Sequence, residues 1–128
     1  MSRNVIVVDD DLNTRVLVKV NLEQKGFSVS AYANGMDALR HLETEQPEVI
    51  IVDLLMPGMS GLELISMIRR RFNTPILVVT AHSDKHELRE QALLAGANNY
   101  MLKPFQRSDL IENVSRMVDG KANASATS

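Results

Sequence analysis

Short runs of branched apolar residues alternate with longer stretches of helical periodicity along this chain. Three of the runs are continuous and bounded by polar residues: Val5–Val8, Val49–Val52 and Ile76–Val79. Such runs are typical of strands buried on both faces. Phe27–Ser30 alternates apolar and polar residues and predicts a weaker strand, and Tyr100–Leu102 predicts another. The pattern therefore predicts five strands.

The stretches that follow these strands repeat apolar residues every three or four positions, which predicts amphipathic helices. Gly26 and Gly96 are expected to end two of them. The helices, with the residues expected to face the core, are Leu12–Lys25 (Leu12, Val16, Val20), Gly35–Glu45 (Met36, Leu39, Leu42), Ser60–Arg71 (Leu62, Ile65, Ile68), Ser83–Gly96 (Leu88, Ala92, Ala95) and Arg107–Val118 (Leu110, Val114, Met117).

Strict alternation of strand and helix predicts the fold class. Five βα units imply a doubly wound α/β fold, in which right-handed crossovers place helices on both faces of a parallel sheet. Residues 1–119 are expected to form one domain. Residues 120–128 are small and polar, so we expect a disordered tail or the start of a linker.

The composition limits the cellular compartment and the kinds of partner that we expect. The chain has 128 residues, a net charge of −2 and no cysteine. Disulfides and thiolate metal sites are therefore excluded, and a reducing compartment such as the cytoplasm is expected. The weak charge gives no reason to expect nucleic-acid binding, and no apolar stretch has the length of a membrane span. Met1 opens directly onto a strand without a signal-peptide pattern, which suggests a natural N-terminus.

Polar residues follow four of the predicted strands. Asp9 and Asp10 follow the first strand, Asp53 the third, Thr80 ends the fourth, and Lys103 follows the fifth. In open parallel sheets, ligands bind outside the carboxyl ends of the strands. We therefore expect these side chains to meet at one edge of the sheet.

The chemistry of this set suits phosphoryl transfer. Neighbouring carboxylates repel one another unless a cation is present, and Mg²⁺ prefers a few carboxylates together with phosphate oxygens. A carboxylate such as Asp53 can act as a nucleophile and form an aspartyl phosphate. Lys103 supplies a positive charge and Thr80 a hydroxyl donor for a phosphoryl oxygen.

Each of these residues also has an ordinary structural interpretation. Aspartates that follow a strand often cap the next helix, and this is what we expect of Asp11. Taken alone, Asp9 and Asp10 fit a cap as well as a site, and only the convergence of all the polar residues favours the site. His41 and His86 are expected to be solvated helix residues.

Four short motifs in this order resemble those of the bacterial response-regulator receiver family. They are Val7-Val8-Asp9-Asp10, Asp53-Leu54-Leu55-Met56-Pro57-Gly58, Val79-Thr80-Ala81 and Lys103-Pro104-Phe105. The resemblance covers about residues 4–119. It implies a flavodoxin-like sheet of strand order 2-1-3-4-5. It also implies a signalling switch that catalyses only its own phosphorylation and slow dephosphorylation.

The resemblance assigns the metal site. Asp53 corresponds to the phosphoacceptor and is also a ligand of Mg²⁺. Asp10 corresponds to the direct Mg²⁺ ligand, and Asp9 to the acidic neighbour that acts through water. Leu55 would offer its backbone carbonyl to the metal.

The resemblance also assigns the phosphate site and the switch. Thr80, Ala81 and Lys103 would contact the phosphoryl group, with a cis Lys103–Pro104 bond aiming the lysine. Thr80 corresponds to the switch hydroxyl, and Tyr100 to the aromatic residue whose rotamer follows it.

The resemblance implies protein partners. A sensor histidine kinase or a phosphotransfer protein would supply the phosphoryl group, and an output protein or a fused effector domain would read the face formed by the fourth helix, fifth strand and fifth helix. A weak or phosphorylation-dependent dimer is also compatible with the resemblance. However, Asn98, Asn99 and Asn113 replace charged residues that the winged-helix class uses for dimerisation. Leu93, Leu94 and Tyr100 form an apolar face that we interpret as core, with a partner surface as the alternative.

Three alternatives remain open. A phosphatase of the haloacid-dehalogenase type would need a second aspartate where Leu55 stands. A flavodoxin-type flavin module would need a phosphate-binding loop after the first strand, and this loop is acidic. A degenerate receiver that serves only as a scaffold would not need the acidic residues or Lys103.

Overall fold

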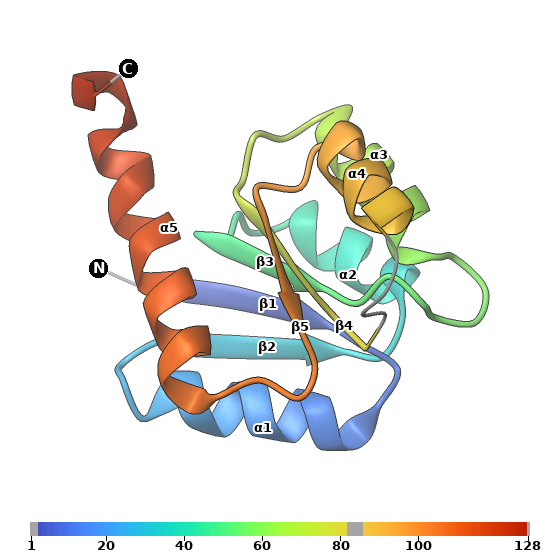
Figure 1. Ribbon diagram of the computed structural model, residues 1–128, viewed down its shortest axis with the longest axis horizontal. Coiled ribbons are helices and arrows are strands. Elements are labelled where there is room, and N and C mark those ends of the chain that lie inside the picture. Colours follow the sequence, from blue (N-terminus) through green and yellow to red (C-terminus); the bar gives the residue numbers. More distant parts are fainter. Residues whose placement is uncertain (1–2, 82–85, 128) are drawn as a thin grey trace.

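A computed structural model describes residues 3–81 and 86–127 of the chain, with the backbone alone for residues 86 and 121–127. Strands and helices alternate throughout this part (Figure 1). The elements are β1 (Asn4–Val8), α1 (Leu12–Glu23), β2 (Ser28–Tyr32), α2 (Gly35–Leu42), β3 (Val49–Val52), α3 (Gly61–Arg69), β4 (Ile76–Thr80), α4 (His86–Ala95), β5 (Asn99–Leu102) and α5 (Arg107–Thr127).

The strands form a single parallel sheet of order β2-β1-β3-β4-β5, which confirms the predicted fold class. β1 and β3 are neighbours although β2 lies between them in sequence, so the connections leave this point of the sheet in opposite directions. Ligands of doubly wound folds bind at such a switch point. Val8 pairs with Val52 in the register of β1 and β3. The residues that follow them, Asp9 and Asp53, are therefore brought side by side.

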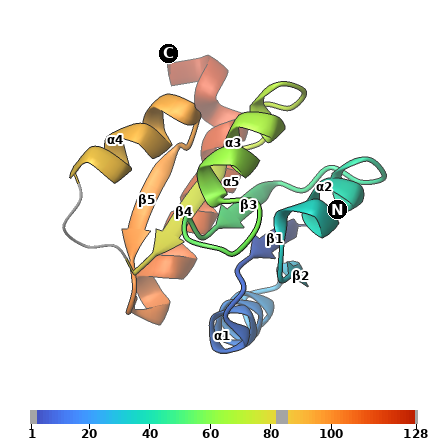
Figure 2. The same ribbon diagram turned by 90° about the vertical axis from the view of Figure 1, so that its right-hand side faces the viewer.

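Two hydrophobic cores lie on the two faces of the sheet. α2, α3 and α4 cover one face, and α1 and α5 cover the other (Figure 2). Successive residues of β1 alternate between them, with Ile6 and Val8 in the first core and Val5 and Val7 in the second. Because both faces are covered, the strands need apolar residues at every position. This explains the continuous runs in the sequence.

The helix α1 turns a different face to the core from the one that its spacing predicted. Leu12, Val16 and Val20 are 60%, 51% and 46% exposed, whereas Val18 and Leu22 are fully buried. The prediction was therefore wrong. The helix carries two apolar stripes, and the stripe that lies over β2 and packs against α5 is the one that is buried.

The other helices follow the predicted faces more closely. Leu42, Ile65, Ile68, Leu110 and Val114 are buried as expected. Three further residues depart from expectation: Met36 is 52% exposed, and Leu93 and Leu94 are 40% and 87% exposed rather than part of the core. Gly26 and Gly96, at the ends of α1 and α4, have the positive φ angles expected of glycines that end helices.

The helix α5 continues to Thr127, past the predicted end at Val118. That residues 120–128 form a disordered tail or the start of a linker stays a prediction. Extending an existing helix costs much less than nucleating a new one, and alanines in this segment favour the extension. None of the helices in the described residues is long and apolar enough to cross a membrane.

The start of α3 packs directly on the chain that carries Asp53. Ser60 and Glu63 form a capping box, in which each side chain accepts the backbone N–H of the other. The N–H of Gly61 donates to the carbonyl of Leu54 over 2.9 Å. A β-carbon at Gly61 would lie 2.6 Å from the α-carbon of Leu54 and would collide with the carbonyl oxygen of Asp53.

Gly61→Ala should therefore destabilise the protein by about 1–3 kcal/mol, as overpacking against fixed backbone does. Gly120→Ala is the matched control, because a β-carbon there meets nothing within 4 Å and alanine is the better helix former, by about 0.5–1 kcal/mol. Urea unfolding of the two variants would check this. Equal midpoints for Gly61→Ala and the wild type would contradict the packing argument.

Candidate functional site

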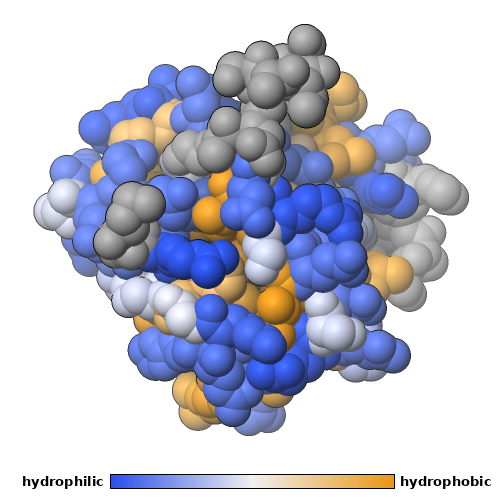
Figure 3. Space-filling model, turned by 90° about the vertical axis from the view of Figure 1, so that its left-hand side faces the viewer, coloured by the Kyte–Doolittle hydropathy of each residue, from blue (hydrophilic) through white to orange (hydrophobic). Residues whose placement is uncertain are grey.

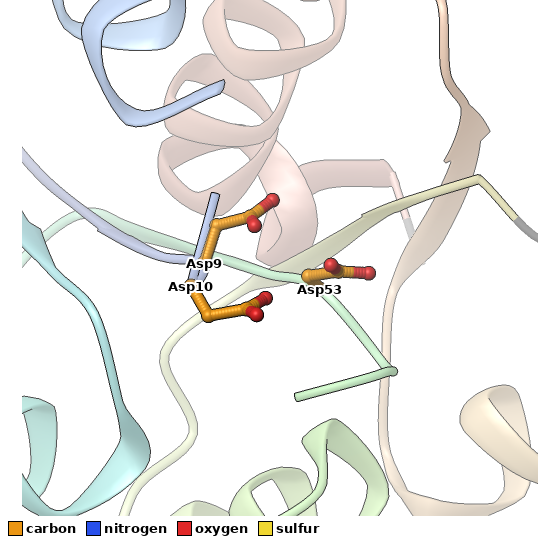
Figure 4. A group of neighbouring side chains, drawn as sticks. All are labelled: Asp9, Asp10 and Asp53. Carbon is orange, nitrogen blue, oxygen red and sulfur yellow. The ribbon is translucent and has the colours of Figure 1, made fainter. Parts of the chain in front are cut away.

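Three carboxylates converge at the carboxyl ends of β1 and β3. Asp9 and Asp10 come from the connection between β1 and α1, and Asp53 directly follows β3 (Figure 4). One oxygen of each lies within 4.8 Å of one oxygen of each of the others. Asp9 and Asp53 are 2% and 7% exposed, whereas Asp10 is exposed to solvent. The cluster is therefore open on the side of Asp10.

Backbone hydrogen bonds hold the cluster in place. The N–H of Asp53 donates to the carbonyl of Val8 over 3.0 Å, and the N–H of Asp9 donates to the carbonyl of Tyr32 over 3.0 Å. Both bonds continue the sheet ladder by one residue beyond the strands. The Asp9 carboxylate accepts a hydrogen bond from the N–H of Asp11 over 2.9 Å. The backbone carbonyl of Asp9 accepts one from the Arg15 guanidinium over 2.8 Å. The positions of these carboxylates thus depend on the sheet rather than on a mobile loop.

Lys103 joins two of the three carboxylates. Its Nζ lies 2.8 Å from Oδ2 of Asp9 and 3.5 Å from Oδ2 of Asp53. Its backbone N–H donates to the carbonyl of Thr80, which extends the pairing of β4 and β5. The Lys103–Pro104 bond is cis, as the resemblance implied. The ammonium is therefore placed between residues that are 94 and 50 positions away in the sequence.

The site carries more negative than positive charge, and the pKa values reflect this. Burial raises the pKa of the Asp9 carboxyl above its usual value, although its hydrogen bonds to Lys103 and to the N–H of Asp11 oppose the rise. For Lys103, burial lowers the pKa, but the hydrogen bond to Asp9 and the charge of Asp53 outweigh it, so the pKa is raised overall. Lys103 therefore stays charged at neutral pH, and burial makes ionisation of the Asp9 carboxyl energetically costly.

Thr80, whose backbone carbonyl accepts the N–H of Lys103, has an unused hydroxyl. The residue ends β4 and is fully buried, and its Oγ1 has no hydrogen-bond partner among the described residues. A buried polar group without a partner typically costs about 1–3 kcal/mol, so its presence calls for a ligand or another explanation. Ala81 follows it and is exposed. Tyr100, on the neighbouring strand β5, is partly buried against the core beneath α4.

The donor set fits Mg²⁺. Hard cations of this size take oxygen ligands, keep several waters and use one or two carboxylates. Asp10 and Asp53 could provide such carboxylates, with Asp9 beside them. Leu55 lies two residues after Asp53, and its N–H is 3.5 Å from Oδ1 of Asp53. Leu55 is 51% exposed, and its backbone carbonyl could serve as a further oxygen ligand.

The remaining sequence predictions have mixed outcomes. Asp11 caps α1 as expected, since its side chain accepts the N–H of Asn13. His41 is not a solvated residue: its Nδ1 lies 2.5 Å from Oη of Tyr32 and its Nε2 lies 2.9 Å from Oε1 of Glu45. The prediction failed because the helical spacing does not show that α2 packs on Tyr32. The prediction for the His86 side chain lies outside the described residues.

Sequence reasoning missed two contributors from α1. Arg15 supports the carbonyl of Asp9, and Leu17 lines a cavity beside Lys103. Leu17 is half exposed, and it adjoins the stripe that was wrongly assigned to the core. The sequence did hold a signal for Leu17. A helix with two apolar stripes has more apolar surface than one core face can bury, so one stripe and the apolar residues next to it must face solvent or a site.

The fold and the cluster define a doubly wound α/β protein with an acidic site at its topological switch point. The family model of the response regulator receiver domain matches residues 5–115. The chain belongs to this family.

Solved structures agree with this assignment. A response regulator from Thermotoga maritima is 35% identical, with a TM-score of 0.85 over 93% of this chain and 99% of that chain. A CheY-like receiver domain protein from Methanospirillum hungatei is 27% identical, with a TM-score of 0.90 over 97% of this chain and 99% of that chain. The BeF3-activated receiver domain of DrrB is 32% identical, with a TM-score of 0.83 over 93% and 99%.

The crowded carboxylates lead to a prediction about metal. Asp10→Asn removes a like charge, so it should raise the melting temperature in chelator by about 3–5 °C, equivalent to about 1 kcal/mol. Mg²⁺ at a hundred times its dissociation constant should stabilise the wild type by about 2.7 kcal/mol and the variant much less. Thermal melts with and without Mg²⁺ would measure both effects.

Asp119→Asn is the control for this experiment, because Asp119 is exposed on α5, away from the cluster. It changes the net charge equally and should respond to Mg²⁺ as the wild type does. A wild type whose melting temperature is the same in chelator and in Mg²⁺ would refute the prediction.

Proposed function

We propose that this chain is a phosphorylation-dependent signalling switch whose Asp53 accepts a phosphoryl group in a Mg²⁺-dependent reaction. One observation carries the proposal: a buried carboxylate lies within reach of an ammonium group and two further carboxylates. A buried hydroxyl on the neighbouring strand β4, with no partner among the described residues, adds a donor. Family membership supports the same role.

The proposed reaction follows from the charges. An Asp53 oxygen attacks phosphorus, the bond from phosphorus to the donor's histidine nitrogen breaks, and the electron pair leaves with the imidazole. Lys103, 3.5 Å from Asp53, would contact a phosphoryl oxygen, and Thr80 would donate its unused hydroxyl to another. Ala81 would contribute its backbone N–H. Bound Mg²⁺ would supply charge neutralisation at Asp10, Asp53 and the carbonyl of Leu55.

A related structure supports the link between this fold and activation. The DrrB receiver domain, 32% identical to this chain, is described as BeF3-activated. Fluoroberyllate is a tetrahedral anion with the size and charge of a phosphoryl group on a carboxylate. The matching position here would be Asp53, because it is the buried carboxylate at the end of β3.

The output surface would be the face formed by α4, β5 and α5. If Thr80 moves to bond a phosphoryl oxygen, it leaves space beside Tyr100, which lies on the adjacent strand and is only partly buried. Leu94, 87% exposed on α4, is the most exposed large hydrophobic residue of this surface. We infer that an output protein or a fused effector domain reads this surface.

Dimerisation through this surface would differ from the charged mode of the winged-helix class. Asn99 donates from its side-chain amide to that of Asn113 over 2.5 Å, which joins β5 to α5. Asn98 accepts from the Arg69 guanidinium and from the N–H of Ile76. These neutral side chains are engaged within the chain, so a weak or phosphorylation-dependent dimer would have to use other contacts.

The phosphoryl donor would be a sensor histidine kinase or a phosphotransfer protein, in the cytoplasm where kinases find ATP. Such a partner must approach the edge that faces the viewer in Figure 2. The exposed residues Leu12 and Val16 of α1 adjoin that edge and provide apolar surface for it. The opposite side of the molecule, where β1 begins, is mostly hydrophilic with scattered hydrophobic patches (Figure 3).

The central prediction concerns Asp53. Acetyl phosphate with Mg²⁺ should add one phosphoryl group to the wild type, and Asp53→Asn should abolish the addition because an amide is a far weaker nucleophile. Intact-mass spectrometry would measure the product. Asp109→Asn, an exposed site on α5, is the control and should label normally. Equal labelling of Asp53→Asn would sink the proposal.

The lifetime of the phosphoryl group should depend on Leu55. Hydrolysis needs a water aligned opposite the bond from Asp53 to phosphorus, and the exposed Leu55 side chain can neither orient nor activate it. Loss should therefore take minutes or longer, and Leu55→Asn should speed it several-fold. Decay after removal of the donor would be followed by mass, with Met67→Asn as a surface control on α3. A slower Leu55→Asn would contradict this reasoning.

A further inference from the structure

A small cavity opens beside Lys103, on the side of the site that faces α1. Its volume is about 350 Å³, near the lower end of the range for small-molecule sites. Leu17 of α1, Ala81 after β4, and Pro104 and Phe105 after β5 supply its apolar walls. The cavity therefore lies between α1 and the segments that follow β4 and β5, and it shares Lys103 with the acidic cluster.

The cavity has one charged wall. Among the described residues that line it, Lys103 is the charged one, and its ammonium reaches Asp9 and Asp53 at 2.8 and 3.5 Å. Asn13 also lines the cavity, and because it is exposed its amide can donate to an oxygen. A molecule in the cavity would thus have an apolar body, one oxygen near Asn13 and an anionic end near Lys103.

We propose that this cavity binds the apolar acyl group of a small acyl phosphate, which donates its phosphoryl group directly to Asp53. The proposal rests on the proposed role of Asp53 and adds a preference among donors. An acyl phosphate has the required shape, because an apolar chain or ring is joined through one carboxyl group to a dianionic phosphoryl group. A cavity of about 150 Å³ already holds benzene, so the volume here accommodates a benzoyl group.

The transfer balances without a proton or a further reactant. An oxygen of the Asp53 carboxylate forms a bond to phosphorus, and the bond from phosphorus to the acyl oxygen breaks. The electron pair of the broken bond leaves on the donor's carboxylate, which Asn13 can hold by a hydrogen bond. Donor and product are both mixed anhydrides of a carboxylic and a phosphoric acid, so the reaction exchanges one carboxylate for another.

The test compares two donors on three chains. Phosphorylation rates would be measured by intact mass with acetyl phosphate and with benzoyl phosphate, both with Mg²⁺. Leu17→Gln replaces an apolar wall by a polar one, and Val20→Gln makes the same change on α1 outside the cavity. Both residues are about half exposed, so neither change should impair folding.

The wild type should prefer benzoyl phosphate, and Leu17→Gln should reduce that preference about tenfold, the low end of what apolar pockets achieve for small changes in fit. Val20→Gln should keep the full preference. The ratio between chains cancels the intrinsic reactivities of the donors.

An unchanged preference in Leu17→Gln, or an equal loss in Val20→Gln, would overturn the cavity assignment while leaving Asp53 as the acceptor. If neither donor labels the wild type, the proposed function fails with it. The two failures are therefore distinguishable.

Discussion

The ammonium group of Lys103 connects the ends of three strands that are distant in sequence. It bonds Asp9 after β1 and approaches Asp53 after β3, while its own backbone continues β5 along β4. Breaking a buried pair of this kind leaves an uncompensated charge, which typically costs several kcal/mol. The packing around the site therefore has to keep these groups together. The sheet order achieves this, because it places β1, β3, β4 and β5 side by side.

In the same arrangement, the negative charge of the site exceeds its positive charge, and one buried hydroxyl lacks a hydrogen-bond partner among the described residues. Asp9, Asp10 and Asp53 contribute three carboxylates, and burial raises the pKa of Asp9 despite its lysine partner. Thr80 holds a buried hydroxyl with no partner among the residues that the structure describes. Both deficits would be relieved by a cation together with a phosphoryl group. The features that lower the stability of the unliganded protein are thus those that the proposed function uses.

The helix α1 shows how one element can serve both core and surface. Val18 and Leu22 bury one stripe against β2 and α5, while Leu12, Val16 and Val20 remain exposed. Leu12, at the start of this stripe, follows the connection that carries Asp9 and Asp10. An exposed apolar stripe along a whole helix is unfavourable in water, and it is explained if a protein partner covers this side.

The strands, the helices, the fold class and the location of the site could all be predicted from the chain. Continuous runs such as Val49–Val52 can only be buried on both faces, and polar residues at the ends of parallel strands must meet at one edge. The roles of Leu55 and Tyr100 came only from the family resemblance. The spacing of apolar residues could not show which of the two apolar stripes on α1 is buried. It also could not show that His41 contacts Tyr32.

The amino-acid sequence by itself therefore determined the order of elements and which polar residues meet at the candidate site, because periodicity and strand ends are local properties. Only the tertiary structure decided that Lys103 bonds Asp9 more closely than Asp53, that Thr80 lacks a partner among the described residues, and that a cavity lies beside them. These features depend on distances between residues up to 94 positions apart. Such distances arise from how the helices pack on the sheet, and no local pattern specifies them.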